Sequence, residues 1–151
     1  MRSLLKYLTI VGLTCFLGTS LAAERGTAKE AEAMVHKAID FTKANGLEKT
    51  LNEINNPAGS LVDRDLYIAV ADQEGKALAH GGNPRMIGKD LSALKDMNGK
   101  QIYKEVIAVA RAKGKGWVDY TWPNPVTQKL EAKTTYLEKF QDVIFVCGAY
   151  K

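Results

Sequence analysis

The feature that most constrains the fold of this chain is a change in the spacing of its apolar residues near residue 65. Upstream of it, apolar side chains recur at the three- and four-residue spacing of an amphipathic helix. This stripe begins with Ala31, Met34, Val35, Ala38, Ile39 and Phe41. From Asp65 onward the period is two, which is the spacing of a strand. Leu66, Ile68 and Val70 alternate there with Tyr67, Ala69 and Ala71. The pattern therefore predicts a helix followed by strands.

The helical segment carries its own start and break signals. Thr27 and Glu30 have the spacing of a capping box, in which each side chain bonds the backbone amide of the other residue. Asn45-Gly46 predicts a break, after which helical spacing resumes until Asn55-Asn56-Pro57. We therefore expect a long, kinked N-terminal helix with one apolar face.

The rest of the chain alternates between strands and helices. The period-two segment ends at the turn Asp72–Gly75, and residues 76–80 form the second strand of a hairpin. After a loop, the sequence predicts a helical turn at 91–95 and a helix at 100–112. Three further strands are predicted at 116–122, 130–139 and 142–150. Consecutive strands with short links favour an antiparallel sheet, so the predicted fold class is α+β, with helices layered on that sheet.

The N-terminus has the pattern of a secretory signal peptide. Arg2 and Lys6 precede an apolar stretch, and Ser20 and Ala22 place small side chains where a signal peptidase cleaves. The stretch is shorter than the roughly 20 apolar residues that a membrane span needs. The prediction is a signal peptide over residues 1–22 and one mature domain over residues 23–151 that is periplasmic or secreted.

Two alternatives to cleavage remain open. The segment could be retained as a membrane anchor, or Cys15 could carry a lipid, although Leu13-Thr14 fits lipid attachment poorly. Loss of residues 1–22 removes two cations and no acid, so the net charge falls from +4 to +2, too little for a nucleic-acid-binding surface. Cys147 then has no partner for a disulfide, so packing must hold the mature domain together.

Motifs for catalysis and for metal binding are missing from the sequence. It has no glycine-rich phosphate loop, paired-cysteine motif or His-Glu-x-x-His zinc motif, and no Gly-x-Ser-x-Gly. His36 fits a partly exposed position on the first helix. His80 ends a strand beside the loop Gly81–Pro84, where it is either a hydrogen-bonded structural group or a ligand contact. We therefore expect no enzyme activity, no metal and no cofactor.

The strand at 116–122 concentrates aromatic residues and suggests a pocket. Val118, Tyr120 and Trp122 point to one face of this strand, and Trp117 points to the other. Large side chains on both faces predict that the sheet is covered on both sides. One cover is the N-terminal helix, and the other is the segment at 91–112.

Lys133, on the following strand, admits two interpretations. A lysine that faces an enclosed site needs an anion as its partner. Aromatic walls around one cation then describe a pocket for a small carboxylate. In the other interpretation, the aromatic residues belong to the core and Lys133 points to water. The residues by themselves leave both interpretations open.

An ordered series of motifs runs from Asp65 to Tyr150. It begins with Leu66-Tyr67-Ile68-Ala69-Val70, Asp72, Gly75 and Ala79-His80. It continues with Asn83-Pro84, Gly88-Lys89-Asp90-Leu91 and Asp96-x-x-Gly99-Lys100. It ends with Gly114-x-Gly116-Trp117-Val118-x-Tyr120-x-Trp122-Pro123-Asn124-Pro125, Lys133-x-x-Tyr136 and Gly148-Ala149-Tyr150. The series, with the helix before it, resembles the extracytoplasmic Cache sensor domain of the small, single-Cache type.

The resemblance implies a PAS-like fold, in which a long N-terminal helix packs on a five-stranded antiparallel sheet with short helices on the ligand side. It also implies a non-catalytic domain that binds a short-chain carboxylate, like the heads of chemoreceptors and sensor kinases. The family usually continues into a transmembrane helix, whereas this chain ends at Lys151. The expected function is thus a secreted, stand-alone sensor that signals through a separate membrane receptor or sensor kinase. The alternative is a structural or protein-interaction module that keeps the fold and has no ligand.

The resemblance also implies roles for particular residues. Lys133 is expected to pair with the carboxylate, Tyr120 to donate from its hydroxyl, and Trp122 to close the apolar side. Tyr103 is expected to reach in from the roof helix, and His80 to line the rim. The long first helix could also pair in a homodimer. One departure from the family pattern is Gln128, which stands where a glycine is expected in the turn after Asn124-Pro125 and is expected to alter that loop only.

Overall fold

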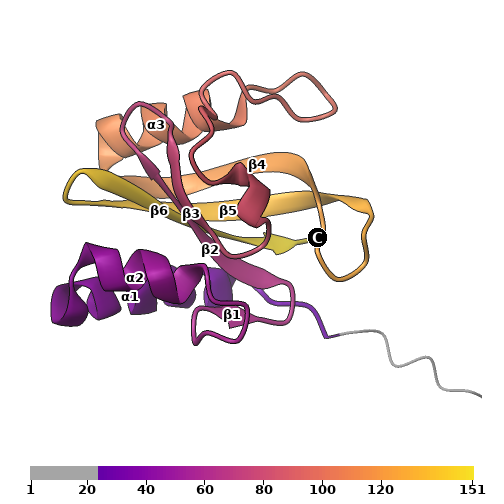
Figure 1. Cartoon of the computed structure of the whole chain (residues 1–151). Coiled ribbons are helices and arrows are strands. Elements are labelled where there is room, and N and C mark those ends of the chain that lie inside the picture. The colour runs from indigo at the N-terminus through magenta and orange to yellow at the C-terminus, as the bar shows by residue number, and fades with distance from the viewer. Residues whose placement is uncertain (1–23) are drawn as a thin grey trace, which may run out of the picture.

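The computed structural model describes residues 24–151 (Figure 1). The predicted signal peptide over residues 1–22, including Cys15, lies outside the described residues. Within residues 24–151, no helix has both the length and the apolar character that a membrane crossing requires.

Two helices near the N-terminus form one layer of the domain. α1 (Ala28–Asn45) begins at the predicted capping box, in which the Thr27 hydroxyl accepts from the Glu30 amide and the Glu30 carboxylate accepts from the Thr27 amide. Gly46 adopts a φ of +86°, a conformation that favours glycine, and separates α1 from α2 (Leu47–Ile54). The predicted break is confirmed, and it divides the long helix into two.

The sheet contains five strands in the order β3-β2-β6-β5-β4, and every pairing is antiparallel. The strands are β2 (Leu66–Asp72), β3 (Ala77–His80), β4 (Lys115–Pro123), β5 (Leu130–Phe140) and β6 (Val143–Tyr150). This arrangement confirms the predicted sheet. A two-residue strand, β1 (Val62–Asp63), pairs with the start of β2 and adds a sixth strand that the hydrophobic pattern does not predict.

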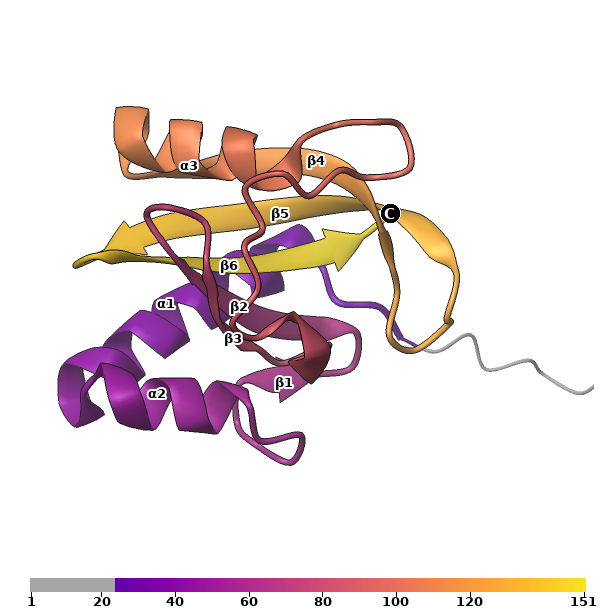
Figure 2. The same ribbon diagram turned by 45° about the horizontal axis from the view of Figure 1, so that its top comes forward.

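Both faces of the sheet are covered, as the aromatic strand predicts. Figures 1 and 2 show α1 and α2 on one side of the sheet and α3 (Ile102–Lys113) on the other. The period-two pattern of β2 decides which side chains face which layer. Ile68 packs in the core under α1 and α2, whereas Ala69 packs in the core under α3.

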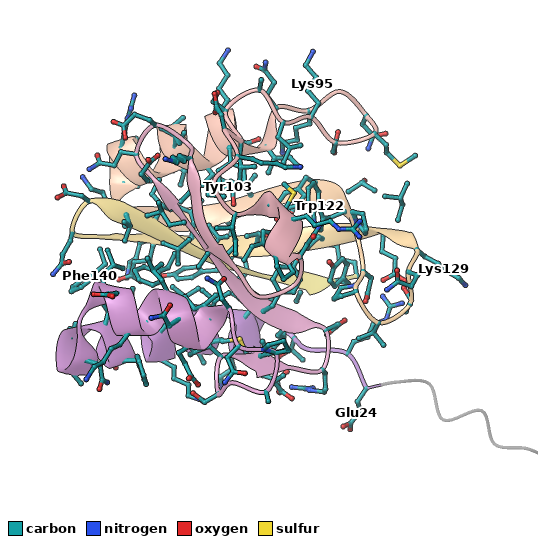
Figure 3. The ribbon with its side chains drawn as sticks, in the orientation of Figure 1. Glu24, Lys95, Tyr103, Trp122, Lys129 and Phe140 are labelled. Carbon is teal, nitrogen blue, oxygen red and sulfur yellow. The ribbon has the colours of Figure 1, made fainter. Side chains whose placement is uncertain are left out.

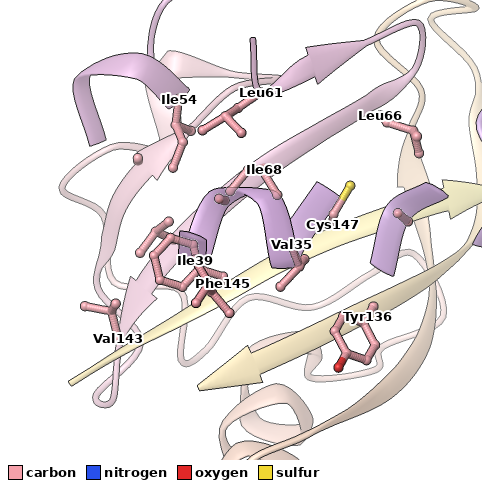
Figure 4. Packing of buried hydrophobic residues seen from close by; sticks show 14 of the residues in the cluster. Val35, Ile39, Ile54, Leu61, Leu66, Ile68, Tyr136, Val143, Phe145 and Cys147 are labelled. Carbon is pink, nitrogen blue, oxygen red and sulfur yellow. The ribbon is translucent and has the colours of Figure 1, made fainter. Parts of the chain in front are cut away.

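The core under α1 is closely packed and includes the centre of β6. Figure 4 shows Phe145, which is fully buried, together with Ile39 of α1 and Ile68 of β2. Cys147 also faces this core, where its Sγ lies 3.8 Å from the Sδ of Met34. Cys147 is therefore a buried, free thiol, as expected for a residue that packs like a small apolar side chain.

The prediction of a helical segment at 91–95 is wrong, because these residues form a turn and not a helix. It contains one turn hydrogen bond, from the Leu94 amide to the Leu91 carbonyl. The start of this segment bonds to the β2–β3 hairpin instead, since the Leu91 amide donates to the Gly75 carbonyl. A short 3₁₀ helix, η1 (Pro84–Met86), lies upstream of this turn. The roof over the sheet therefore consists of η1, an extended segment and α3.

The turn between β4 and β5 explains the departure at Gln128. This residue has a φ of +60°, a left-handed conformation in which a glycine carries no steric cost. The turn is held by Asn124, whose side-chain oxygen accepts from the Val126 and Thr127 amides. The side-chain nitrogen of Asn124 also donates to Glu131 at 3.0 Å. The glutamine is thus accommodated in a turn that these hydrogen bonds already hold.

Candidate ligand-binding site

A cavity lies between the sheet and the roof on the α3 side, and all five predicted site residues line it. The predicted residues are His80, Tyr103, Tyr120, Trp122 and Lys133. Figure 3 marks Tyr103 on α3 and Trp122 on β4. The other lining residues are Tyr67, Ala69, Met86, Leu91, Leu94, Ile102, Thr135, Val146, Cys147 and Gly148. No acidic residue is among the lining residues that the structure describes.

The position of Lys133 follows from the register of three neighbouring strands. Lys133 on β5 pairs with Tyr120 on β4 and with Tyr150 on β6, so the three residues form one row across the sheet. Directly paired residues point to the same face of a sheet. Lys133 is 2% exposed. The interpretation in which it points to water is therefore wrong.

The ammonium group of Lys133 is held by aromatic groups. Its Nζ lies 3.9 Å from the centroid of the Tyr67 ring and 4.4 Å from that of the Tyr150 ring. Its hydrogen bond, at 3.3 Å, goes to the Tyr150 hydroxyl, which in turn donates to the Pro123 carbonyl at 2.7 Å. Between residues 24 and 151, no carboxylate forms an ion pair with Lys133. Burial therefore lowers the pKa of Lys133 to about 7.

Gly148 makes room for this lysine on the central strand. A Cβ atom at position 148 would overlap Cε of Lys133 and Oγ1 of Thr135. The lysine side chain therefore crosses the backbone of β6 at a glycine, where no side chain blocks its path. Gly82 plays a similar part for Tyr67, because a Cβ at position 82 would lie 2.7 Å from the Tyr67 ring.

His80, which is predicted to line the rim, lies buried in the lining at the β3 side of the cavity. It is 5% exposed, and its ring lies 5.1 Å from that of Tyr67. Its Nδ1 accepts a hydrogen bond from the Asn83 amide at 3.0 Å, so the neutral ring carries its proton on Nε2. Burial, with a smaller contribution from the charge of Lys133, lowers the pKa of His80 to about 4. His80 is therefore neutral near pH 7.

The remaining predicted residues form the aromatic side of the cavity. The rings of Tyr120 and Trp122 meet edge to face, with centroids 6.1 Å apart. The Tyr120 hydroxyl bonds Oγ1 of Thr135 at 3.0 Å. Tyr103 of α3 is 7% exposed and lines the cavity. Its hydroxyl is a group that can donate to a ligand or accept from one.

The cavity is small and mostly apolar. About 20 Å³ is open to the centre of a water molecule, which is room for a water molecule or a small polar group. Its apolar wall comes from Met86, Leu91, Leu94 and Ile102. No cluster of metal-ligating side chains occurs in residues 24–151. The chemistry of the lining suits a small ligand that has one anionic end and a short apolar part, and such a ligand needs more room than the cavity has in this structure.

The sequence-based prediction omits the other lining residues and Tyr150, and four of the omitted residues shape the surroundings of Lys133: Tyr67, Thr135, Gly148 and Tyr150. Tyr67 could have been found from the alternation of β2, because it points away from Ile68 and thus away from the core under α1. Tyr150 and Gly148 become site residues only through the pairing of β6 with β5, which the pattern within either strand does not reveal.

The comparisons with known proteins agree on the family. Residues 22–151 match the model of the family described as single Cache domain 2. The methyl-accepting chemotaxis protein McpP of Pseudomonas putida is 34% identical over 87 residues, which make up 58% of this chain and 16% of that protein. The chain therefore corresponds to only a small part of that relative.

Solved structures share the fold. A periplasmic sensor domain of a chemotaxis protein is 26% identical, with a TM-score of 0.63 over 81% of this chain and 88% of that one. A Cache chemosensory domain, solved to explain carboxylic acid recognition, is 27% identical, with a TM-score of 0.63 over 81% and 86% of the two chains. A methyl-accepting chemotaxis protein from Vibrio parahaemolyticus has a TM-score of 0.70 at 23% identity, over 81% and 86%. With the family model matched over residues 22–151, the chain belongs to the single Cache domain 2 family of chemosensory domains, which are sensors and not enzymes.

Proposed function

We propose that this sensor domain binds a small carboxylate and that Lys133 is the positive partner of the carboxylate group. The observation that carries the proposal is a buried lysine without an ionic partner among the described residues, in a cavity with no acidic lining. A buried charge without a partner is costly, and an anionic ligand removes that cost. The carboxylic acid recognition described for one structural neighbour supports the same class of ligand.

Polar groups around Lys133 could complete the recognition of the carboxylate. The Tyr103 hydroxyl and Nε2 of His80 are donors on residues that line the cavity. The Tyr120 hydroxyl, already bonded to Thr135, could reorient toward a ligand. The apolar wall and Trp122 would then cover the short carbon chain. Because the cavity has room for little more than a water molecule, the roof must move outward to admit a carboxylate, and this favours carboxylates with few carbon atoms.

Titration calorimetry with acetate, propionate, lactate and pyruvate tests this proposal. Lys133→Met keeps the bulk of the side chain and removes the charge. A charge-assisted hydrogen bond contributes roughly 1.5–3 kcal/mol, so Lys133→Met should weaken binding by about tenfold to a hundredfold. Lys139→Met is the matched control, because Lys139 lies on the same strand and is exposed. Binding by Lys139→Met should equal that of the wild type.

Two results would contradict the proposal. Equal binding by wild type and Lys133→Met would remove Lys133 from the site. If the wild type binds none of the four acids and its melting temperature is unchanged in a wider ligand screen, the alternative gains support. That alternative is a structural or interaction module with this fold and no ligand.

We further propose that the domain works outside the cytoplasm and passes its signal to a separate membrane receptor or sensor kinase. The predicted signal peptide and the periplasmic sensor domain among the structural neighbours support this location. N-terminal sequencing of the fractionated protein should find Ala23 or Glu24 at the mature end. Recovery of Met1 in the membrane fraction would instead indicate a retained anchor.

Pairing of two copies through α1 remains a prediction. The solvent-facing side of α1 includes His36, Lys37 and Asp40. Light scattering coupled to size-exclusion chromatography gives the mass in solution. A cysteine placed at Lys37 should crosslink two copies if this side of α1 forms the contact, and it should not do so in a monomer.

A further inference from the structure

We propose that the cavity takes up one proton together with each carboxylate, so that the domain responds jointly to the concentration of the acid anion and to pH. The inference rests on the proposed function, because it assigns a regulation to the same cavity. Its basis is the set of groups that surround Nζ of Lys133.

Every element packed around Nζ presents a group that is neutral near pH 7. The facing groups are Tyr67 of β2, His80 of β3, Tyr103 of α3, Tyr120 of β4 and Tyr150 of β6. The Cys147 thiol lies on the opposite face of β6, in the core under α1. Aromatic faces attract an ammonium group, but they replace only part of its hydration. The free cavity therefore disfavours the charged form of Lys133.

Two carboxylates on this side of the domain, those of Asp65 and Glu131, are already engaged elsewhere. Asp65 accepts from the Gly26 amide at 2.7 Å and from the Asn124 side chain at 3.4 Å. Glu131 is paired with Arg25 at 3.1 Å and also accepts from Asn124. The charge of Asp65 favours protonated Lys133 from a distance, but burial has the larger effect.

Lys133 is also the lining group whose charge can change near neutral pH. Burial lowers its pKa to about 7, while it lowers the pKa of His80 to about 4 and raises those of Tyr120 and Cys147 to about 12. Burial raises the pKa of Tyr103 as well. A carboxylate beside Nζ favours the ammonium form and raises the pKa of Lys133. By linkage, binding then draws a proton from solution wherever free Lys133 is neutral.

The expected size of the effect follows from the pKa of about 7 in the free protein. If the bound lysine stays protonated, uptake should be about 0.9 proton per ligand at pH 8 and about 0.1 at pH 6. The dissociation constant should rise by about tenfold from pH 6 to pH 8. Simple carboxylic acids are fully ionised over this interval, so the ligand itself contributes no proton change.

Calorimetric titration with propionate, at each pH in two buffers of different ionisation enthalpy, measures the uptake directly. The apparent enthalpies in the two buffers should differ at pH 8 and nearly agree at pH 6. Lys133→Arg is the matched control, because a guanidinium stays charged throughout. Its binding of propionate should not depend on pH, and its two enthalpies should agree at pH 8.

The outcomes separate this inference from the proposed function. Propionate binding with equal affinity at pH 6 and pH 8, and without proton uptake, overturns the inference and leaves the carboxylate site in place. No binding of any of the four acids at either pH overturns both.

A second measurement, the unfolding free energy against pH, tests the lysine without a ligand. A folded-state pKa below the unfolded value makes the unfolded chain bind more protons between pH 7 and pH 10.5. The wild type should therefore gain stability relative to Lys133→Met as pH rises through this interval. Parallel curves for the two proteins would overturn the inference.

Discussion

The Nζ atom of Lys133 lies 3.9 Å from the centroid of the Tyr67 ring, although β6 separates the strands that carry the two residues. The contact is made across β6, where Gly148 leaves the sheet surface open. A lysine and an aromatic ring that do not sit on neighbouring strands thus define the centre of the site.

Removal of the Tyr67 ring should make the ammonium form of Lys133 less favourable. A cation over an aromatic face gains about 0.5–2 kcal/mol, and 1.36 kcal/mol corresponds to one pKa unit. Tyr67→Leu should therefore lower the pKa of Lys133 by about one unit. Tyr67→Phe keeps the ring and should leave that pKa nearly unchanged. An NMR titration of the lysine side chain measures both, and an unchanged or higher pKa in Tyr67→Leu would show that the ring does not stabilise the charge.

Gly148→Ala should disturb the site through the lysine and the threonine that pack over it. The added Cβ would overlap Lys133 and Thr135, and overpacking typically costs about 1–3 kcal/mol of unfolding free energy. Thr135→Ala removes one of the two overlaps. The double variant should therefore be less destabilised than the sum of the two single changes. Urea unfolding measures all three, and strict additivity would mean that the backbone absorbs the new Cβ without contacting Thr135.

Asp96→Asn should loosen the roof of the cavity. One carboxylate oxygen of Asp96 accepts from the Asn98 and Lys100 amides, and the other accepts from the Thr121 amide of β4 at 3.1 Å. These bonds lower the pKa of Asp96, and the one to Thr121 contributes most. In the asparagine variant, an NH₂ group faces either the Thr121 amide or the other two amides. Because an NH₂ group is a donor and cannot accept from an amide, at least one of these hydrogen bonds is lost.

Hydrogen exchange of residues 95–101 measures this loosening. Exchange should rise severalfold in Asp96→Asn and should change little in α1, on the opposite side of the sheet. Because the pKa of Asp96 is lowered in the folded state, its stabilising contribution is present above the unfolded pKa. It is lost as pH falls through the folded value. Unchanged exchange in residues 95–101 would mean that other contacts fix the roof.

His80 should make the domain sensitive to moderate acid. Its folded pKa of about 4 lies below the ordinary histidine pKa of 6.5, so the unfolded chain binds more protons between these two values. Stability should fall as pH drops through this interval, by about 2 kcal/mol near pH 4.5. His80→Asn keeps an acceptor for the Asn83 amide and does not titrate. Unfolding free energies at pH 7 and pH 4.5 should therefore differ less in the variant, and an equal loss in both proteins would assign the acid sensitivity to other groups.

Local sequence patterns are sufficient to predict most of the helices and strands of this domain. The start of α1 at Thr27, its break at Gly46 and the alternation of β2 depend on residues close together in the chain. The strand predicted at 116–122 is observed at Lys115–Pro123, because its pattern also depends on residues close together in the chain. The turn at 91–95 is different, because its first residue, Leu91, bonds to Gly75 and the preceding Asp90 pairs with Lys76, both in the distant hairpin. A local pattern cannot show that competition.

The candidate site, too, is only partly predictable from the sequence. The aromatic strand and the family resemblance bring His80, Tyr103, Tyr120, Trp122 and Lys133 together, and all five line one cavity. Their contact with a ligand stays a prediction. Within a strand, alternation places Tyr120 and Trp122 on one face, but it does not tell which layer that face meets.

The groups that surround Lys133 are set by contacts between strands that lie far apart in the chain. Its burial depends on the register that sets it beside Tyr120 on one strand and Tyr150 on the other. Its contact with Tyr67 depends on β2 joining the far side of β6, with Gly148 in between. A shift of one residue in any of these pairings would turn side chains to the opposite face. Strand pairing is set by the packing of the whole sheet, and for that reason the sequence names the lysine and the structure supplies its partners.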